Sequence, residues 1–188
     1  MGLFSRFRKL RGYALTVQLN ARLQPMHRGA RFEDPLAVAL ERVGGAVTGG
    51  GSALDDLSRI LSCTIDVVIG EDYPDESLDT LIRSLESLSA PRGSRIELGD
   101  EVREFGVIEG IAIRMPPLEV DYENDDYIPC SHELDTVMAS VTTALADAGE
   151  IWSWRLNGSD AEIYVYGASR ETIRARLDIE GAELIDIA

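Results

Sequence analysis

The 188-residue sequence has little of several residue types, and each scarcity excludes a class of protein. Its two cysteines, Cys63 and Cys130, form no CxxC pair, which excludes a disulfide scaffold and a zinc ribbon. No apolar run approaches the roughly 20 residues of a membrane span, and no signal-peptide pattern is present, so we expect a cytoplasmic protein without stable membrane insertion. Lys9 is the only lysine, an arginine bias typical of a bacterial protein.

Basic residues are few, and they concentrate at the beginning of the chain. Residues 1–31 carry +7, which leaves −22 on the rest and −15 overall. Between Arg114 and Arg155 there is no basic residue, and the acidic residues there predict a docking surface for a basic protein partner. The expected partner-binding acids are Glu119, Asp121, Glu123, Asp125, Asp126, Glu133 and Asp135. The alternative is a solvated face that keeps the protein soluble. In either case the acidic charge excludes a general nucleic-acid binder.

Hydrophobic periodicity divides the chain into two halves with the same order of elements. In the first half we expect strands at 13–23, 46–52, 60–69 and 93–98, because apolar residues alternate or run continuously there. Helices are predicted after Asp34-Pro35, ending near Gly44, and over the apolar stripe from Leu78 to Leu88. The order is β-α-β-β-α-β.

The second half predicts the same order around an acidic insertion. Strands are expected at 107–115, 151–156, 162–166 and 182–187, with an Asn157-Gly158 hairpin turn. Ser131 and Ser169 are predicted helix N-caps, and Gly149 is the expected residue after the first of these helices. Residues 116–130 show no periodicity, so we expect an exposed connection there.

The β-α-β-β-α-β order resembles that of ferredoxin-like folds, and the chain resembles a tandem of two such units, as in proteins with ACT-like domains. This α+β resemblance implies two antiparallel sheets, each with helices on one face. We expect a basic tail at 1–12, the first unit at 13–98, a linker at 99–106 and the second unit at 107–188, with the insertion at 116–130. The resemblance is one of topology and implies no catalytic residue.

Two glycine-containing stretches are candidate anion or ligand sites. Gly49, Gly50 and Gly51 follow a predicted strand and invite comparison with phosphate-binding loops, although no GxGxxG or following Lys-Ser/Thr is present. Arg92 and Arg95 flank a glycine turn and offer two guanidinium groups to a carboxylate or phosphate. In both cases the alternative is an ordinary connection or bulge between elements.

Metal and catalytic signatures are weak. Residues 121–126 supply carboxylates but depart from the EF-hand pattern, with Asp126 where a glycine is needed and His132 where a glutamate is needed. Neither His27 nor His132 has a metal-ligand spacing, and Cys63 lies in an apolar strand, where we expect an inert buried thiol. We therefore predict no metal, no cofactor and no catalytic residue.

Aromatic residues alternate on two neighbouring predicted strands. Trp152 and Trp154 lie on one, and Tyr164 and Tyr166 on the next, so we expect the four to pair on one face of the sheet. If helices cover that face, the four residues are core. If it is open, they form an aromatic platform for a partner, which makes Trp152 and Trp154 candidate partner-binding residues.

These observations favour a binding protein over an enzyme. The first reading is an acidic protein that docks a basic partner, which resembles in class and charge the small bacterial immunity proteins that neutralise nucleases. The second is a regulatory module that binds a small metabolite at the interface of the two repeats. An enzyme with an Asp, Glu and Arg site is third, and the sequence leaves the oligomeric state open.

Overall fold

In the computed structural model, residues 12–69, 74–98, 101–123 and 128–187 are described, and side chains are described outside 70–75, 98–100 and 121–130. The first unit contains β1 (Tyr13–Leu19), α1 (Pro25–Arg28), the π-helical η1 (Gly29–Glu33), α2 (Asp34–Glu41), β2 (Ala46–Leu54), β3 (Ile60–Ile69), α3 (Pro74–Ser87), β4 (Ser94–Leu98) and β5 (Glu101–Phe105). Its antiparallel sheet has the order β2-β3-β1-β4-β5. The first four positions follow the ferredoxin-like order.

The second unit repeats this arrangement. It contains β6 (Glu109–Arg114), β7 (Asp121–Glu123), β8 (Ile128–Cys130), α4 (His132–Leu145), β9 (Glu150–Asn157), β10 (Asp160–Gly167), α5 (Arg170–Arg176) and β11 (Glu183–Ile187). The antiparallel sheet has the order β11-β6-β10-β9, while β7 and β8 pair as a separate ribbon. The tandem ferredoxin-like fold expected from the sequence is therefore confirmed.

Each sheet carries its helices on one face, as the alternating sequence requires. In the first unit, buried residues of β1 and β3 such as Val17 and Ile65 form a core with Leu36 of α2 and Leu81 of α3. The second core joins Ile113 and Ile163 to α4 and α5. Ser131 and Ser169 cap α4 and α5, because each hydroxyl accepts a hydrogen bond from the N–H three residues later.

Several local expectations need correction. The first helical region begins at Pro25, well before Asp34, and Asp34 has helical φ and ψ. Pro35 has no N–H and a ring that clashes with an ordinary preceding helical turn, which explains why the π-helical η1 directly precedes it. α4 ends at Leu145, so the residue that follows it is Ala146, with φ +48°, and Gly149 lies farther along the chain than expected.

Two connections contain strands. The expected linker at 99–106 includes β5, which pairs with β4 from Ser94↔Phe105 to Leu98↔Glu101 and extends the first sheet. The insertion at 116–130 includes the β7-β8 ribbon, in which Asp121 pairs with Cys130. None of the described helices is both long and apolar enough to cross a membrane.

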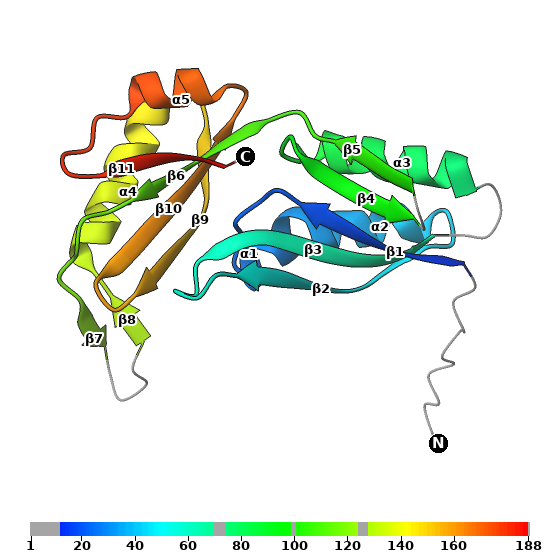
Figure 1. The fold of residues 1–188 in the computed structure, drawn as a ribbon, viewed down its shortest axis with the longest axis horizontal. Coiled ribbons are helices and arrows are strands. Elements are labelled where there is room, and N and C mark those ends of the chain that lie inside the picture. Colours follow the sequence, from blue (N-terminus) through cyan, green and yellow to red (C-terminus); the bar gives the residue numbers. More distant parts are fainter. Residues whose placement is uncertain (1–11, 70–73, 99–100, 124–127, 188) are drawn as a thin grey trace.

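The helix-free face of the second unit's sheet packs against the first unit. Figure 1 shows the sheet of the second unit standing between its own helices and the first unit. Its helix-free face contributes Trp152, Tyr164, Tyr166 and Ile187 to the same hydrophobic core as the first unit's β1 and β3. Both units therefore contribute to the first core, and their junction is part of the folded interior.

Candidate ligand-binding groove between the two units

A β-bulge decides which aromatic residues reach the junction. Tyr164 pairs with Ser153 and Val165 with Ile151, so Trp152 is the extra residue on β9. Trp152 consequently joins Tyr164 and Tyr166 on the helix-free face, whereas Trp154 packs with the core beneath α4 and α5. The expectation of four aromatic residues on one face is wrong for Trp154, because period-2 alternation fails across a bulge.

Trp152 lies at the centre of a stack that joins the units. Its ring is 4.2 Å from the Tyr166 ring, and Phe32 of η1 meets it edge-on at 5.8 Å. The Arg31 guanidinium lies 4.0 Å from its centroid in a cation–π contact. With 4% of its surface exposed, Trp152 is not available as a surface platform for a protein partner.

Glu150 completes this arrangement. Its Oε1 accepts a hydrogen bond from the Trp152 indole Nε1 at 2.8 Å and pairs with Arg31 at 2.9 Å. Partial burial raises the pKa of Glu150, but the hydrogen bonds from Arg31 and Trp152 outweigh it and bring the pKa below its usual value. We call Arg31, Glu150 and Trp152 the latch, because they tie η1 of the first unit to β9 of the second.

A serine–histidine contact lies beside the latch. His27 Nδ1 is 2.8 Å from the Ser153 hydroxyl, and this hydroxyl accepts a hydrogen bond from the Gln24 N–H. Burial, followed by the nearby Arg31, lowers the pKa of His27. The distance would suit a nucleophile and its base, but Ser153 is fully buried, so a substrate cannot reach it. The pair holds α1 on β9.

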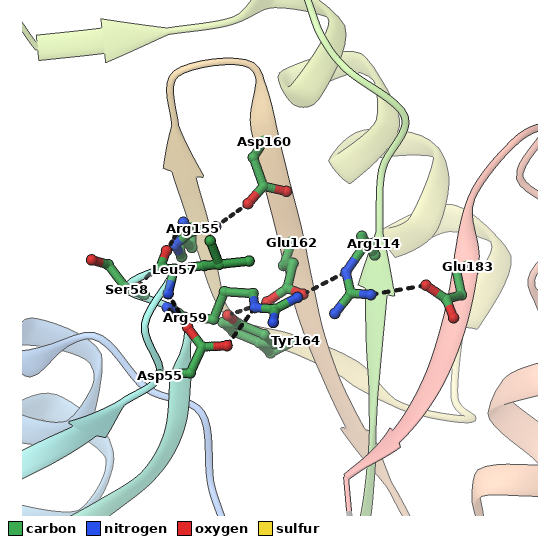
Figure 2. A network of polar contacts seen from close by, with 10 residues as sticks. All are labelled: Asp55, Leu57, Ser58, Arg59, Arg114, Arg155, Asp160, Glu162, Tyr164 and Glu183. Carbon is green, nitrogen blue, oxygen red and sulfur yellow. Dashed lines mark hydrogen bonds and ion pairs between the residues drawn. The ribbon is translucent and has the colours of Figure 1, made fainter.

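The opposite end of the junction is a polar network centred on Glu162 (Figure 2). This fully buried carboxylate accepts hydrogen bonds from Arg114 Nε at 3.0 Å and from the Tyr164 hydroxyl at 2.8 Å. Burial, together with the charge of Glu162, raises the pKa of Tyr164. Arg114 also pairs with Glu183 on β11 at 2.9 Å, so the charges alternate across three neighbouring strands.

Arg155 connects this network to the first unit. It donates to the carbonyl oxygens of Ser58 at 3.0 Å and Leu57 at 2.7 Å, both in the β2-β3 turn, and it pairs with Asp160 at 2.9 Å. Arg59 of the same turn is held by Asp55 and lies close enough to Glu162 for the two charges to attract. These contacts fix the relative orientation of the units at this end.

Between the latch and the ends of two helices, the junction leaves open space. One hollow of about 460 Å³ is lined by His27, Ala30, Arg31, Ser87, Leu88, Ser89 and Trp152. A second, of about 350 Å³, is lined by Ser89, Ile108, Ala146, Asp147, Ala148, Gly149, Glu150, Trp152, Tyr166, Gly167 and Ala168. They share Ser89 and Trp152, and we call the two together the interunit groove.

The groove contains two residues in a strained backbone conformation. Ser89 follows α3 with φ +64°, and Ala146 follows α4 with φ +48°. Glycine is the usual residue in such positions, because a side chain there costs about 1 kcal/mol. One strained residue comes from each unit, and both line the second hollow. Strain of this kind often accompanies binding sites.

The glycine candidates lie elsewhere and have a structural role. Gly49, Gly50 and Gly51 are in the extended edge strand β2 and do not form a loop around an anion. A Cβ on Gly50 would lie 2.6 Å from the Thr64 carbonyl oxygen and 2.9 Å from Glu33 Oε1. Glu33 pairs with the buried Arg28, which also donates to the Gly51 carbonyl. The glycines thus make room for an ion pair that fastens α1 and η1 to the sheet edge.

The remaining sequence candidates are dispersed. Arg92 pairs with Glu109, and Arg95 contacts Gln18 and Glu97, so both guanidinium groups already have partners. Glu119, Glu133 and Asp135 are exposed near the start of α4, whereas the side chains of Asp121, Glu123, Asp125 and Asp126 lie outside the described residues, as does the basic tail before Gly12. Cys63 is buried as expected, and burial raises its pKa.

The known proteins to which this chain is similar are all distant from it. No protein-family model and no curated protein matches the chain. The regulatory subunit of aspartate kinase from Thermus thermophilus is 17% identical over 87% of this chain and 88% of its own, with a TM-score of 0.27. An unknown protein from Galdieria sulphuraria is 11% identical over 93% and 97% of the two chains, with a TM-score of 0.27.

A third solved structure, an anthrone oxidase-like protein, is 12% identical over 91% of this chain and 79% of its own, with a TM-score of 0.24. TM-scores this low carry no argument about function, and nothing in the comparisons supports the resemblance to immunity proteins. The strand orders themselves define the class: two ferredoxin-like units joined through the helix-free face of the second.

Proposed function

We propose that this protein is a non-catalytic binding module that holds a small molecule in the interunit groove. The observation that carries the proposal is the pair of hollows that meet at Ser89 and Trp152 between the units. Each hollow falls within the roughly 300 to 1,000 Å³ typical of small-molecule sites. Their walls combine a buried aromatic side chain with a few charged groups, which is the usual composition of such sites.

A binding role fits the groove better than a catalytic one. The serine–histidine contact beside it has its hydroxyl fully buried, and the latch groups are already paired with one another. Because both units supply walls, a ligand in the groove would contact both and stabilise one relative orientation of the units. Such coupling suits a regulatory role, which is the metabolite-binding reading of the sequence.

Filling the groove tests the proposal. Ala30 and Ala168 are exposed and line the first and second hollow, so Ala30→Trp and Ala168→Trp would fill the space with little effect on the core. Ala139→Trp, on the exposed face of α4, is the matched control. The full-length protein is mixed with a metabolite extract of its host, and retained compounds are identified by mass spectrometry. We expect a compound that the control retains and at least one filled variant loses; equal retention by all three would contradict the proposal.

A second candidate function is the docking of a basic protein on the acidic segment from Glu119 to Asp135. The supporting observation is that Glu119, Glu133 and Asp135 are exposed in the stretch between Arg114 and Arg155, where the sequence has no Lys or Arg. If this surface binds, reversing these acids to lysine should slow association far more than it speeds dissociation, because rim charges act on the encounter. An association rate insensitive to both charge reversal and salt would contradict it.

A further inference from the structure

An apolar hollow lies beside this acidic surface, on the outer side of the second unit. Its volume is about 480 Å³, and it is lined by Pro116, Pro117, Leu118, His132, Glu133, Thr136 and Val137. The segment after β6 crosses the first turn of α4 here, and the Glu119 N–H donates to Glu133 Oε2 at 3.0 Å, which holds the two walls together. The hollow is open at the surface and has room for large apolar side chains.

Acidic side chains lie in the wall of this hollow and next to it in the chain. Glu133 belongs to its wall, and Glu119 and Asp135 are exposed next to it in the chain. After Asp135, residues 136–146 of α4 and its end carry no charge at all. An apolar hollow with an acidic rim selects an occupant that combines apolar side chains with basic ones.

Residues 1–11 of this chain have that chemistry. Leu3, Phe4, Phe7 and Leu10 would share one side of a helix, while Arg6, Arg8, Lys9 and Arg11 give the segment a charge of +4. This segment lies outside the described residues, so the structure leaves its position open. Its positive charge contrasts with the net charge of −19 on the rest of the chain.

We propose that the apolar hollow beside Glu133 binds residues 1–11 of a second copy of this chain. A second copy is the better source because β1 begins at the end of the first unit that faces away from the second unit (Figure 1). The inference rests on the second candidate function, the docking of a basic partner on the acidic surface, and it identifies residues 1–11 as the basic segment that docks there.

The test measures binding of a fluorescently labelled synthetic peptide of residues 1–11 to the full-length protein by anisotropy. A second peptide, with Phe4 and Phe7 both changed to serine, keeps the same charge. We expect the native peptide to bind at least about tenfold more tightly, because burying each phenyl ring contributes severalfold. Thr136→Arg, which places a large basic group in the hollow, should weaken binding similarly, whereas Glu41→Lys on α2 should leave it unchanged.

The outcomes separate this inference from the docking function on which it rests. If both peptides bind equally and Glu133→Lys weakens both, the acidic surface docks basic segments but the named occupant is wrong. If neither peptide binds at low salt, both ideas fail. If Thr136→Arg leaves the native peptide's affinity unchanged, the hollow is not the site. Sedimentation of the full-length protein should also show self-association that Phe4→Ser with Phe7→Ser abolishes; a monomer at all concentrations would overturn the proposal.

Discussion

The Glu162 network allows the energetic role of the junction to be measured. Glu162 is fully buried, and its carboxylate is shared by Arg114 and the Tyr164 hydroxyl. Glu162→Gln keeps the shape and an oxygen that can accept from Tyr164, but it removes the charge that Arg114 faces. Glu162→Leu removes the acceptor as well. The pair of variants therefore separates the charge from the hydrogen bond.

The expected losses of stability depend on how exposed the partners of Glu162 are. Removing one partner of a fully buried ion pair costs about 3 to 5 kcal/mol. Arg114, however, is 32% exposed and keeps Glu183, so we expect Glu162→Gln to lower the free energy of unfolding by about 1 to 2 kcal/mol. Glu162→Leu should lower the free energy of unfolding by about 1 to 3 kcal/mol more than Glu162→Gln does, because the buried Tyr164 hydroxyl loses its acceptor.

Urea unfolding followed by tryptophan fluorescence measures these differences, with Tyr164→Phe as the partner variant. In the Tyr164→Phe background, Glu162→Leu should lower the free energy of unfolding little more than Glu162→Gln does, because no buried tyrosine hydroxyl is then left without an acceptor. The reasoning is refuted if Glu162→Gln lowers the free energy of unfolding as much as Glu162→Leu does. It is also refuted if the difference between these two variants is the same in the Tyr164→Phe background. Because both units contribute to the first core, we also expect a single unfolding transition.

Three further predictions test other parts of the structure. Neutral His27 stabilises the junction at pH values above its unfolded pKa of about 6.5. Because its folded pKa is lower, this stability is lost as the pH falls from 6.5 through the folded pKa. The free energy of unfolding of His27→Gln should therefore depend less on pH than that of the wild type between about pH 7.5 and pH 5. Gly50→Ala should cost about 1 to 3 kcal/mol in urea unfolding because its Cβ meets Thr64 and Glu33, whereas Gly49→Ala, whose nearest neighbour is 3.6 Å away, should cost clearly less; equal costs would contradict the role assigned to Gly50. Ser89→Gly and Ala146→Gly should each raise the melting temperature, by the equivalent of up to about 1 kcal/mol, since glycine relieves the left-handed strain; a lower melting temperature would show that the side chains contribute more than the strain costs.

The element order was predictable because each element carries its own local signal. Local signals of this kind are the apolar alternation of β1 and the serine caps of α4 and α5. The expected β9-β10 hairpin is also present, although its two-residue loop is Gly158-Ser159, because Asn157 pairs with Asp160. β5 was missed because Glu101, Arg103 and Glu104 break the apolar alternation, and Arg103 is held instead by a contact with Asp79 of α3. The π-helical turn before Pro35 likewise has no periodic signature.

The groove was not predictable in its residues, although the sequence suggested a ligand between the repeats. Its walls come from segments as distant as Arg31, Ser89 and Trp152, and only the packing of one unit on the other sheet brings them together. The bulge at Trp152 places Trp152 and Trp154 on opposite faces of the sheet, and nothing in the local sequence pattern marks it. Arg31 looked like one of several basic residues near the beginning of the chain, yet it pairs with Glu150 across the junction.

The central claim is that a small molecule binds between the units, and the two tryptophans provide a direct reporter of it. The Trp152 indole N–H donates to Glu150 where the two hollows meet. Trp154 packs against the core beneath α4 and α5, and its ring centroid lies 4.8 Å from that of His27 in the wall of the first hollow. In a ¹⁵N-correlated NMR spectrum the two indole signals can be assigned with Trp152→Phe. On saturation with the retained compound, we predict a large shift of the Trp152 signal, because its indole N–H lies where the two hollows meet, and a smaller shift of the Trp154 signal, which reaches the groove through His27. Saturable binding that leaves the Trp152 signal in place would contradict the account.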